Sequence, residues 1–415
     1  MRRLKQLLYF PLARYFGFFA AIQLRRWKPR IVVITGSNGK TTTLEMVKSQ
    51  LGDRVNYSDK ANSAYGIPFD ILNLKQKNFS SIEWFYFFFA APFKAFYKLN
   101  KENIYIVEAD CDRPSEGKFL SKLLKPECVI WLSSDRTHSM NYDKLSNGNF
   151  KTVDDAIAYE YGYFVRSNPK LAIINGDNEL ICEQSKKLDK KDIIRISDCK
   201  EYNLSEQGTE FVAENKFKFS DLLPKKSFYS IQAAISLMKY LDLEPDLSFK
   251  HFVTPPGRSS LLKGIKNTTL VDSSYNANFS STQAILSMVK ELKNPNKWLV
   301  FGGMLEQGSS EMEEHKKLAP EIKEVNFKQI IFVGALAKKY LSSEFKDNSI
   351  SFEKPKEALN YLLKNIRGDE LILFKGGRME GIVEQMLRDK SDVLKLCRRE
   401  EIYAKKRRAM GLQNN

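Results

Sequence analysis

The chain has 415 residues, of which 43% are hydrophobic and 28% are charged. This composition excludes an intrinsically disordered chain and predicts a soluble globular protein that buries a sizeable core. The length predicts two domains of ordinary size. Five scattered cysteines form no C-x-x-C pair, which argues against a zinc ribbon or a disulfide framework and favours the reducing cytoplasm.

The formal net charge of +16 fits three kinds of partner: nucleic acid, an anionic membrane surface or an acidic substrate. Basic residues are spread along the chain and are denser at both ends, without a recognition helix or an RNA-binding signature to organise them. A nucleic acid partner is therefore not expected. Solvated basic faces remain the simplest alternative.

The first 29 residues predict a helix rich in arginine and aromatic side chains. Its longest uncharged run, Tyr15 to Leu24, has only ten residues, whereas a membrane-crossing helix needs about 20. Pro11 and Arg14 interrupt the apolar region that a signal peptide would need. Two interpretations stay open: the helix lies on an anionic membrane surface, or it packs on the domain that follows.

Residues 31–43, IVVITGSNGKTTT, predict a strand, a glycine-turned loop and a helix that begins near Thr41. Such a loop turns its backbone N–H groups toward phosphates, and the helix N-terminus adds positive potential. Lys40 would supply a charge to the β- and γ-phosphates, and Thr41 a hydroxyl for Mg²⁺. The alternative is a Ser/Thr-rich helix cap. The residues expected to bind nucleotide here are Gly36, Ser37, Asn38, Gly39, Lys40, Thr41 and Thr42.

A second aromatic run, WFYFFFAAPFKAF at residues 84–96, indicates either core or a contact surface. We expect core.

Short apolar runs that end in polar residues recur along the rest of the chain and predict parallel strands with helices between them. The predicted strands cover residues 105–110, 128–132, 171–175, 269–272, 298–301, 329–333 and 371–374. A Pro-containing connection near residue 245 separates two α/β domains, which we place at 30–245 and 246–397. A basic tail, 398–415, is expected to be solvated.

Several motifs in this order resemble the Mur ligase family of ATP-dependent amide-forming enzymes, and most closely the branch that adds D-alanyl-D-alanine to a muramoyl tripeptide. The resemblance covers nearly the whole chain after residue 30. The matching elements are TGSNGKTT at 35–42, NSAYGIP at 62–68, Glu108-Ala-Asp110, His138, Pro256-Gly-Arg258, Asp272, YNAN at 275–278, GGMLE at 302–306, His315 and Lys375-Gly-Gly-Arg378.

The resemblance implies a central P-loop ATPase domain with a parallel sheet, followed by a C-terminal Rossmann-like α/β domain. It also implies a cytoplasmic ligase that uses ATP and Mg²⁺ and joins an amino acid or dipeptide to a cell-wall precursor through an acyl phosphate. A ligase for another carboxylate is the nearest alternative. A catalytically degenerate homologue that binds nucleotide and acts as a partner protein is the other.

The resemblance also assigns roles to residues of the central domain. Lys40 would clamp the γ-phosphate. Thr41 and Glu108 would hold the first Mg²⁺, and His138 would contact the second. Outside the family context, Glu108 could be a strand-end surface carboxylate, and His138 could be structural.

For the C-terminal domain, the resemblance implies that Arg258 reaches the ATP phosphates across the interdomain cleft. Asp272 would contact the ribose or orient the hinge, and Asn276 would face the adenine or the bound intermediate. A surface arginine, a strand-end cap and a turn are the respective alternatives. The residues expected to bind substrate are Asn62, Asn278, Lys375 and Arg378.

The chain departs from the family pattern at several positions. Tyr161 stands where many relatives carry a carbamylated lysine that bridges the metals, so the second metal is either absent or held by Glu160 and His138. Where the family has a His-x-x-x-Asn pair near the adenine, this chain has Lys226 and Ser230. Where the family has a proline after Tyr-Asn-Ala-Asn, this chain has Phe279. The match also begins without the separate UDP-sugar domain usual in this branch, which suggests a differently presented peptide or substrate binding by the central domain alone.

Overall fold

The computed structural model describes the chain except for Met1, Arg378 and residues 59–60, 77–79, 98–100, 146–147, 149, 187, 189–191, 206 and 413–415. The chain forms two compact units. Unit 1 comprises residues 1–198 and 229–252, and unit 2 comprises residues 199–228 and 253–415. Segment 199–228, which the sequence analysis places in the central domain, belongs to unit 2.

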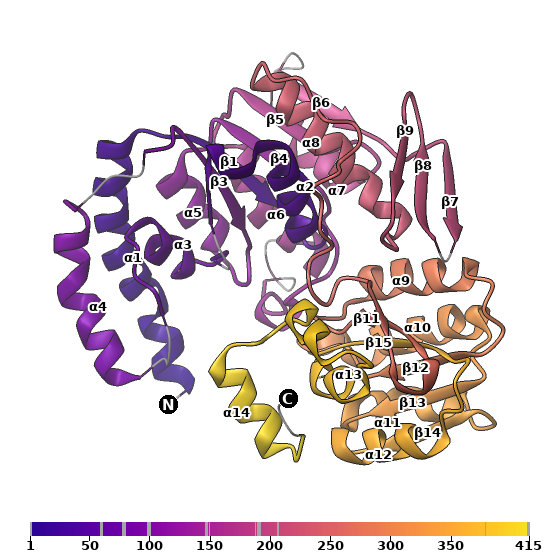
Figure 1. The fold of residues 1–415 in the computed structure, drawn as a ribbon. Coiled ribbons are helices and arrows are strands. Elements are labelled where there is room, and N and C mark those ends of the chain that lie inside the picture. Colours follow the sequence, from indigo (N-terminus) through magenta and orange to yellow (C-terminus); the bar gives the residue numbers. More distant parts are fainter. Residues whose placement is uncertain are drawn as a thin grey trace. The chain divides into compact units, whose positions relative to one another are not determined.

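Unit 1 is built on a parallel sheet with strand order β2-β3-β1-β4-β5-β6 (Figure 1). Its strands are β1 (Arg30–Thr35), β2 (Asn56–Tyr57), β3 (Ile104–Ala109), β4 (Cys128–Trp131), β5 (Leu171–Asn175) and β6 (Ile193–Ile196). Its helices are α1 (Arg2–Trp27), α2 (Lys40–Leu51), α3 (Gly66–Ile71), α4 (Ser81–Lys94), α5 (Glu116–Leu124), α6 (Val153–Val165), α7 (Glu179–Gln184) and α8 (Phe228–Tyr240).

Strand β1 is buried along almost its whole length, as its β-branched sequence predicts for a strand covered on both faces. Ile31 and Val33 belong to the core that α1, α5 and α6 also line. The chain leaves β1 toward β2 and β3 on one side and then crosses to β4 on the other. Such a switch point opens a crevice at the carboxyl ends of the strands, which is where open α/β sheets bind ligands.

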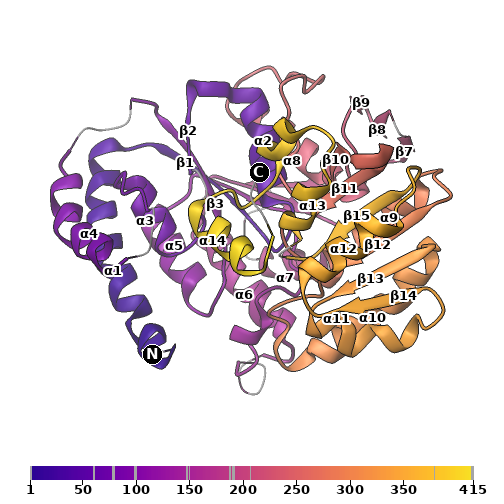
Figure 2. The ribbon, with the colours of Figure 1, turned by 60° about the horizontal axis from the view of Figure 1, so that its bottom comes forward.

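Unit 2 has a second sheet with strand order β10-β11-β15-β12-β13-β14, in which only the pair β10 and β11 is antiparallel (Figure 2). A separate antiparallel sheet joins β7 (Glu201–Ser205), β8 (Gly208–Val212) and β9 (Lys216–Phe219). The other strands are β10 (Ser260–Lys263), β11 (Thr269–Ser273), β12 (Lys297–Phe301), β13 (Gln329–Val333), β14 (Ser349–Phe352) and β15 (Leu371–Lys375). The helices are α9 (Phe279–Glu291), α10 (Glu311–Val325), α11 (Ala335–Leu341), α12 (Pro355–Asn365), α13 (Glu380–Met386) and α14 (Glu401–Ala409).

Helix α1 packs on unit 1 along one side. Ala13, Phe16, Ala20, Leu24 and Trp27 are buried in the core of that unit. The segment Leu7–Trp27 has the length and hydropathy of a membrane-crossing helix. Because much of the same segment is buried against protein, these properties are also those of a core helix.

Helix α4 corrects the expectation that the second aromatic run is core. Phe87 and Ala91 are buried, but Phe85, Phe89 and Phe93 are more than half exposed. The run is therefore core on one side only.

The basic tail is also not uniformly solvated. It forms α14, and Arg407 is only 1% exposed. Its Nε lies 3.5 Å from Oε2 of the buried Glu384. The same oxygen forms an ion pair of 2.7 Å with Nη1 of Arg399. Two guanidinium groups thus share one buried carboxylate, which explains why this part of the tail is ordered on unit 2.

Candidate nucleotide and metal site

The loop between β1 and α2 has the strand-loop-helix form that the sequence predicts. Gly36 has φ 126° and Gly39 has φ 88°, both in the region that favours glycine. A Cβ on Gly36 would lie 2.8 Å from the backbone oxygen of Ser133. The Ser37 N–H donates to that oxygen at 3.1 Å, and the Asn38 N–H donates to Ser133 Oγ at 2.8 Å. The loop is therefore held in place by the segment after β4.

Lys40 is the first residue of α2 and is only 7% exposed. Its ammonium lies 2.9 Å from Asp110 Oδ2 and donates to the Gly36 carbonyl at 2.5 Å. Burial disfavours the charged form, but the Asp110 and Glu108 carboxylates outweigh burial and raise the pKa of Lys40. Lys40 thus carries a fixed positive charge beside the loop.

Asp110 is held from two sides. Tyr161 donates to its Oδ1 at 2.5 Å, while Lys40 pairs with Oδ2. Burial opposes ionisation, yet the charges of Lys40 and His138 dominate and lower the pKa of Asp110. The hydroxyl of the buried Tyr161 therefore orients the Asp110 carboxylate.

Glu108 and Thr41 come together as expected. Glu108 is paired in register with Ile34 of β1, and Thr41 Oγ1 donates to Glu108 Oε1 at 3.2 Å. The Glu108 N–H donates to Ser58 Oγ at 2.9 Å, which fixes the end of β3. The strand-end position thus faces the phosphate loop.

His138 lies with Asp110 and Asp112, and one ligand atom of each lies within 4.8 Å of the others. His138 Nε2 is 3.2 Å from Asp112 Oδ1. The Asn141 amide donates to the Asp112 carbonyl at 2.7 Å and pins the loop between the two groups. Two carboxylates and an imidazole form a donor set that fits a divalent cation.

Glu160 does not join this group. Its Oε2 accepts from the Gly117 N–H at 3.2 Å, at the start of α5. Burial outweighs these backbone hydrogen bonds and raises the pKa of Glu160. Glu160 thus contacts the start of α5, and the clustered groups that could hold a metal beside His138 are Asp110 and Asp112.

The predicted substrate segment 62–68 lies against the same loop. The Asp110 N–H donates to the Asn62 carbonyl at 2.8 Å. The fully buried Glu116 accepts from the Ala64 N–H at 2.7 Å, from the Asp112 N–H at 3.0 Å and from the Tyr9 hydroxyl at 2.8 Å. Burial, with the Asp112 charge second, raises the pKa of Glu116 to about 7.

Unit 2 brings a second set of predicted residues together at the carboxyl ends of its strands. The buried Lys375 donates to the Asn276 carbonyl at 2.9 Å and lies 3.3 Å from Ser281 Oγ. Arg258 stacks over the Tyr275 ring at 4.0 Å. Burial and then the Arg258 charge lower the pKa of Lys375 to about 7, with Asp272 acting in the opposite direction.

Other motif residues of unit 2 have structural contacts. Asn278 caps α9 by accepting from the Ser281 N–H at 2.8 Å. The buried Asp272 accepts from the Ser274 N–H at 3.0 Å. His315 Nε2 accepts from the Met304 N–H at 2.9 Å and so holds the 302–306 turn. Arg378 lies outside the described residues.

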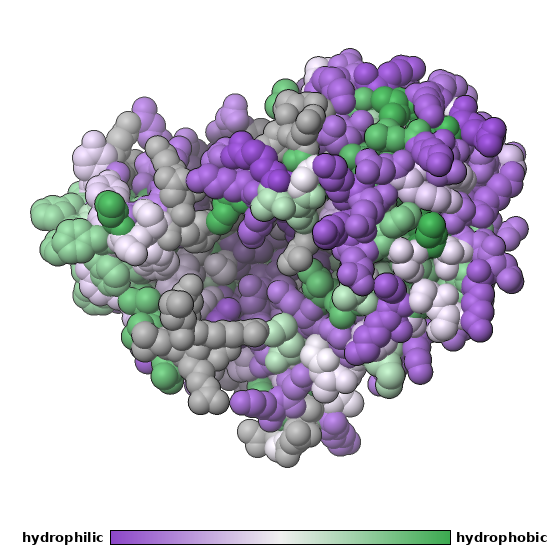
Figure 3. Space-filling view, turned by 90° about the horizontal axis from the view of Figure 1, so that it is seen from below, coloured by the Kyte–Doolittle hydropathy of each residue, from purple (hydrophilic) through white to green (hydrophobic). Residues whose placement is uncertain are grey.

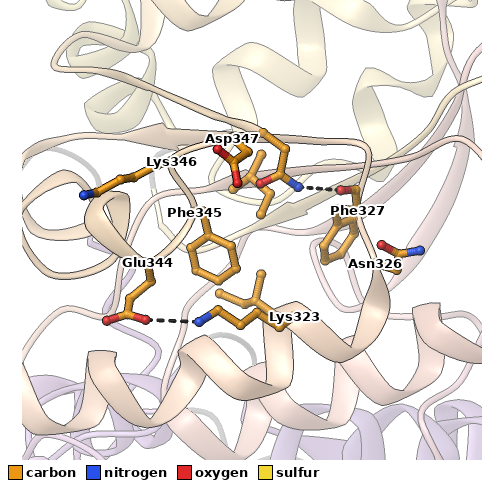
Figure 4. A pocket seen from close by; sticks show the side chains of 10 residues that line it. Lys323, Asn326, Phe327, Glu344, Phe345, Lys346 and Asp347 are labelled. Carbon is orange, nitrogen blue, oxygen red and sulfur yellow. Dashed lines mark hydrogen bonds and ion pairs between the residues drawn. The ribbon is translucent and has the colours of Figure 1, made fainter.

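A pocket of about 220 Å³ opens elsewhere in unit 2, between the end of α10 and the segment that precedes β14 (Figure 4). Phe327 and Phe345 line it, and an ion pair of 3.1 Å between Lys323 and Glu344 closes one side. None of its lining residues belongs to the motifs described above.

Sequence reasoning missed the metal-binding potential of Asp110 and Asp112 and the support from Ser133 and Asp135. The alternation Glu108-Ala-Asp110-Cys-Asp112 directly after a predicted strand was a usable signal, because it places three carboxylates at one strand end. The link from Ser37 Oγ to the Asp135 carbonyl, at 2.7 Å, joins residues nearly a hundred positions apart. A contact between residues so far apart in the sequence cannot be predicted from a local sequence pattern.

In unit 1, a loop of P-loop form lies at the switch point of a parallel sheet, with the donor group of Asp110, Asp112 and His138 beside it. A second α/β unit is formed by the same chain. This combination is typical of a P-loop enzyme that uses a nucleoside triphosphate. The Mur ligase middle domain model matches residues 34–238, and the model "Mur ligase, glutamate ligase domain" matches residues 257–378. The chain belongs to the Mur ligase family, whose members are ATP-dependent ligases that form C–N bonds.

Curated relatives include the UDP-N-acetylmuramoyl-tripeptide–D-alanyl-D-alanine ligase of Borreliella burgdorferi, which is 26% identical over 84% of this chain and 72% of its own length. The ligase of the same name from Bacillus subtilis is 25% identical over 89% of this chain and 78% of its own length. Among solved structures, the MurF ligase of Thermotoga maritima in complex with ADP matches with a TM-score of 0.71 and 20% identity, covering 92% of this chain and 84% of that one.

The residues of unit 1 fit the cofactors of the family, ATP and Mg²⁺. The loop is shaped by two glycines with positive φ, and a Cβ at Gly36 would collide with the neighbouring segment. The hydroxyl, carboxylate and imidazole groups beside it are ligands that Mg²⁺ accepts, oxygen being preferred.

Proposed function

We propose that the protein joins D-alanyl-D-alanine to the peptide carboxylate of a muramoyl tripeptide precursor. The observation that carries the proposal is the group formed by Lys40, Asp110, Asp112 and His138 beside the phosphate loop. The proposed substrates come from the relatives, since the two curated proteins described above are ligases for this tripeptide and dipeptide.

In this proposal, the carboxylate takes the γ-phosphoryl group of ATP to form an acyl phosphate and ADP. The amine of the dipeptide then attacks the acyl carbon, and the amide forms as inorganic phosphate and a proton leave. Negative charge builds on phosphoryl oxygens throughout, so the residues act mainly by position and charge. Lys40 and the N–H groups of residues 36–41 stabilise the transferred phosphoryl group. Glu108, Thr41, Asp110, Asp112 and His138 would hold Mg²⁺, which would supply positive charge to the phosphates, and Tyr161 orients the Asp110 carboxylate.

The proposal is tested by phosphate release from purified protein with ATP, Mg²⁺ and UDP-muramoyl tripeptide, with and without D-alanyl-D-alanine. We expect release to depend on the dipeptide and a new amide product to appear by mass spectrometry. ATP binding without any transfer would favour the nucleotide-binding partner protein. Transfer to another amine only would favour a ligase for a different substrate.

Replacing Glu108 by Gln should weaken Mg²⁺ binding about tenfold or more, because a neutral amide replaces a carboxylate beside Thr41. Activity should recover in part as Mg²⁺ is raised, and a Mg²⁺ titration of the rate measures this. Glu45→Gln, at a surface ion pair on α2, is the matched control. A defect that does not respond to Mg²⁺ would remove Glu108 from the metal site.

Lys375 should bind the carboxylate of an anionic substrate with uptake of a proton. Because its pKa is lowered to about 7, the free side chain is mostly neutral at pH 8, and a bound anion favours the ammonium. Affinity should therefore be highest below pH 7 and fall as the pH rises above it. Calorimetry with D-alanyl-D-alanine at pH 8, in two buffers of different ionisation enthalpy, measures the proton.

Lys375→Met should abolish that proton uptake, and Lys338→Met, at a surface ion pair with Glu353, should not. Uptake that persists in Lys375→Met would assign the proton to another group.

We also propose that the protein works in the cytoplasm with a peripheral contact to an anionic membrane surface. One side of α1 is buried against unit 1, so α1 alone is not the helix that we expect to contact the membrane. The neighbouring helix α4 has exposed aromatic side chains.

A further inference from the structure

One side of helix α4 packs against the core of unit 1. Phe87 lies 5.0 Å from the Phe69 ring, and Phe88 lies 5.3 Å from the Phe16 ring of α1. The Tyr15 hydroxyl of α1 donates to the Phe88 carbonyl at 2.7 Å. The two helices run side by side at one edge of unit 1 (Figures 1 and 2). One apolar side is thus accounted for.

The other side of α4 is also apolar, and it faces solvent. Apart from the adjacent Phe85 and Tyr86, its residues follow each other at spacings of three and four, which places them along one side of the helix and of the turn that follows it. They are between 56% exposed for Tyr86 and 82% exposed for Ile82. We call this stripe the aromatic face, and its members are Ile82, Phe85, Tyr86, Phe89, Phe93 and Phe96.

The aromatic face is unlike an ordinary protein surface. Figure 3 shows hydrophobic side chains gathered over this edge of unit 1. Burial of such side chains is favourable, so several of them exposed on one stripe mark an interaction site. A helix that is apolar on both sides needs a second apolar environment in addition to its own core.

Cations adjoin the aromatic face at its C-terminal end. Lys94 lies 5.3 Å from the Tyr97 ring centroid, and the Arg26 guanidinium lies 5.7 Å from that of Phe96. Arg26 also donates to the Ala95 and Tyr97 carbonyls at 2.9 and 3.2 Å. Arg26 is therefore held beside the exposed rings, and Lys94 lies at the same end of α4, on a chain with a net charge of +16.

This combination favours a bilayer over a protein partner. Between residues 80 and 97, Glu83 is the one acidic residue and Lys94 the one basic residue, so the stripe offers few groups to orient a specific protein. An apolar stripe of about 20 Å, at 1.5 Å per residue, suits the plane of a membrane interface. Aromatic rings and neighbouring cations are the side chains preferred at that depth, where lipid phosphates lie.

We propose that unit 1 docks on an anionic lipid bilayer through the aromatic face of α4, with Lys94 and Arg26 at the headgroups. The contact is peripheral: α4 lies in the interface plane while its opposite side stays packed on α1. It requires neither nucleotide nor the proposed ligase activity.

The test is co-sedimentation of the full-length chain with phosphatidylcholine vesicles, with and without phosphatidylglycerol, at low and moderate salt and without ATP. Binding should require the anionic lipid and weaken with salt. The triple variant Phe85→Ser/Phe89→Ser/Phe93→Ser should bind at least about tenfold more weakly. Lys94→Gln should lose about fivefold, on anionic vesicles only.

Leu394→Ser is the matched control, because Leu394 is 81% exposed but lies in unit 2. It should bind vesicles like the unaltered chain. The phenylalanines and Leu394 are exposed and Lys94 is partly exposed, so thermal unfolding should confirm that each variant folds. Equal pelleting of the unaltered chain and the triple variant, or no pelleting of either, would overturn the proposal. Loss of self-association in the triple variant, without vesicle binding by either protein, would assign the face to a second copy of the chain.

Discussion

Replacing Lys40 by Ala should reduce ligation by more than about 10²-fold. The side chain is a buried ammonium at the phosphate loop, and the carboxylates of Asp110 and Glu108 raise its pKa against the effect of burial. Its loss removes positive charge where negative charge develops. Losses of this order are typical when one such electrostatic contact is removed. The measurement is the initial rate of amide formation at saturating ATP and dipeptide.

Lys48→Ala is the control for this variant, because Lys48 lies on the same helix but pairs with Glu45 on the surface. It should leave the rate within about twofold of the unaltered chain. A Lys40→Ala enzyme with near-normal turnover would contradict the assignment of the loop as the phosphate site.

Asp110→Ala should cause the largest loss of folding stability among single changes at the site, about 3 kcal/mol. Removing one partner of a buried ion pair leaves the other charge without compensation. The Lys40→Ala/Asp110→Ala double variant should be more stable than Asp110→Ala alone, because it removes that remaining charge. Urea unfolding of the four proteins in the cycle measures the coupling free energy.

Additive effects of the two substitutions would show that Lys40 and Asp110 do not depend on each other. The same Asp110→Ala protein should also bind Mn²⁺ more weakly by electron paramagnetic resonance, since it loses one of the three clustered donor groups. Unchanged Mn²⁺ binding would remove Asp110 from the metal site.

The elements that local sequence reveals best are the buried parallel strands. The predicted strands at 171–175 and 329–333 coincide with β5 and β13. Their uninterrupted apolar runs with β-branched residues have no helical periodicity, so the signal is strong. By contrast, β7, β8 and β9 carry alternating polar residues, and β2 has only two residues. Such short or half-exposed strands depend on partners elsewhere in the chain.

The candidate site divides in the same way. Lys40 and Thr41 were predictable because loop, lysine and hydroxyl lie within a few positions of one another. The pairing of Lys40 with Asp110, and of Tyr161 with Asp110, depends on the order of strands in the sheet, which the motif alone does not contain. For the second aromatic run we expected core over a contact surface, and α4 proved to be core on one side only. Composition shows that a helix is apolar but not which of its sides is covered.

The path of the chain between the two units bears on how the protein could be dissected. Unit 1 is completed only when residues 229–252 return to it, after segment 199–228 has contributed to unit 2. The Thr43 hydroxyl of α2 donates to Ser230 Oγ of α8 at 2.8 Å in a buried contact. The returning segment 229–252 therefore supports α2, the helix that follows the phosphate loop. A fragment that stops at residue 198 would therefore lack part of its own nucleotide-binding framework, and each unit is encoded by two separate stretches of sequence rather than one.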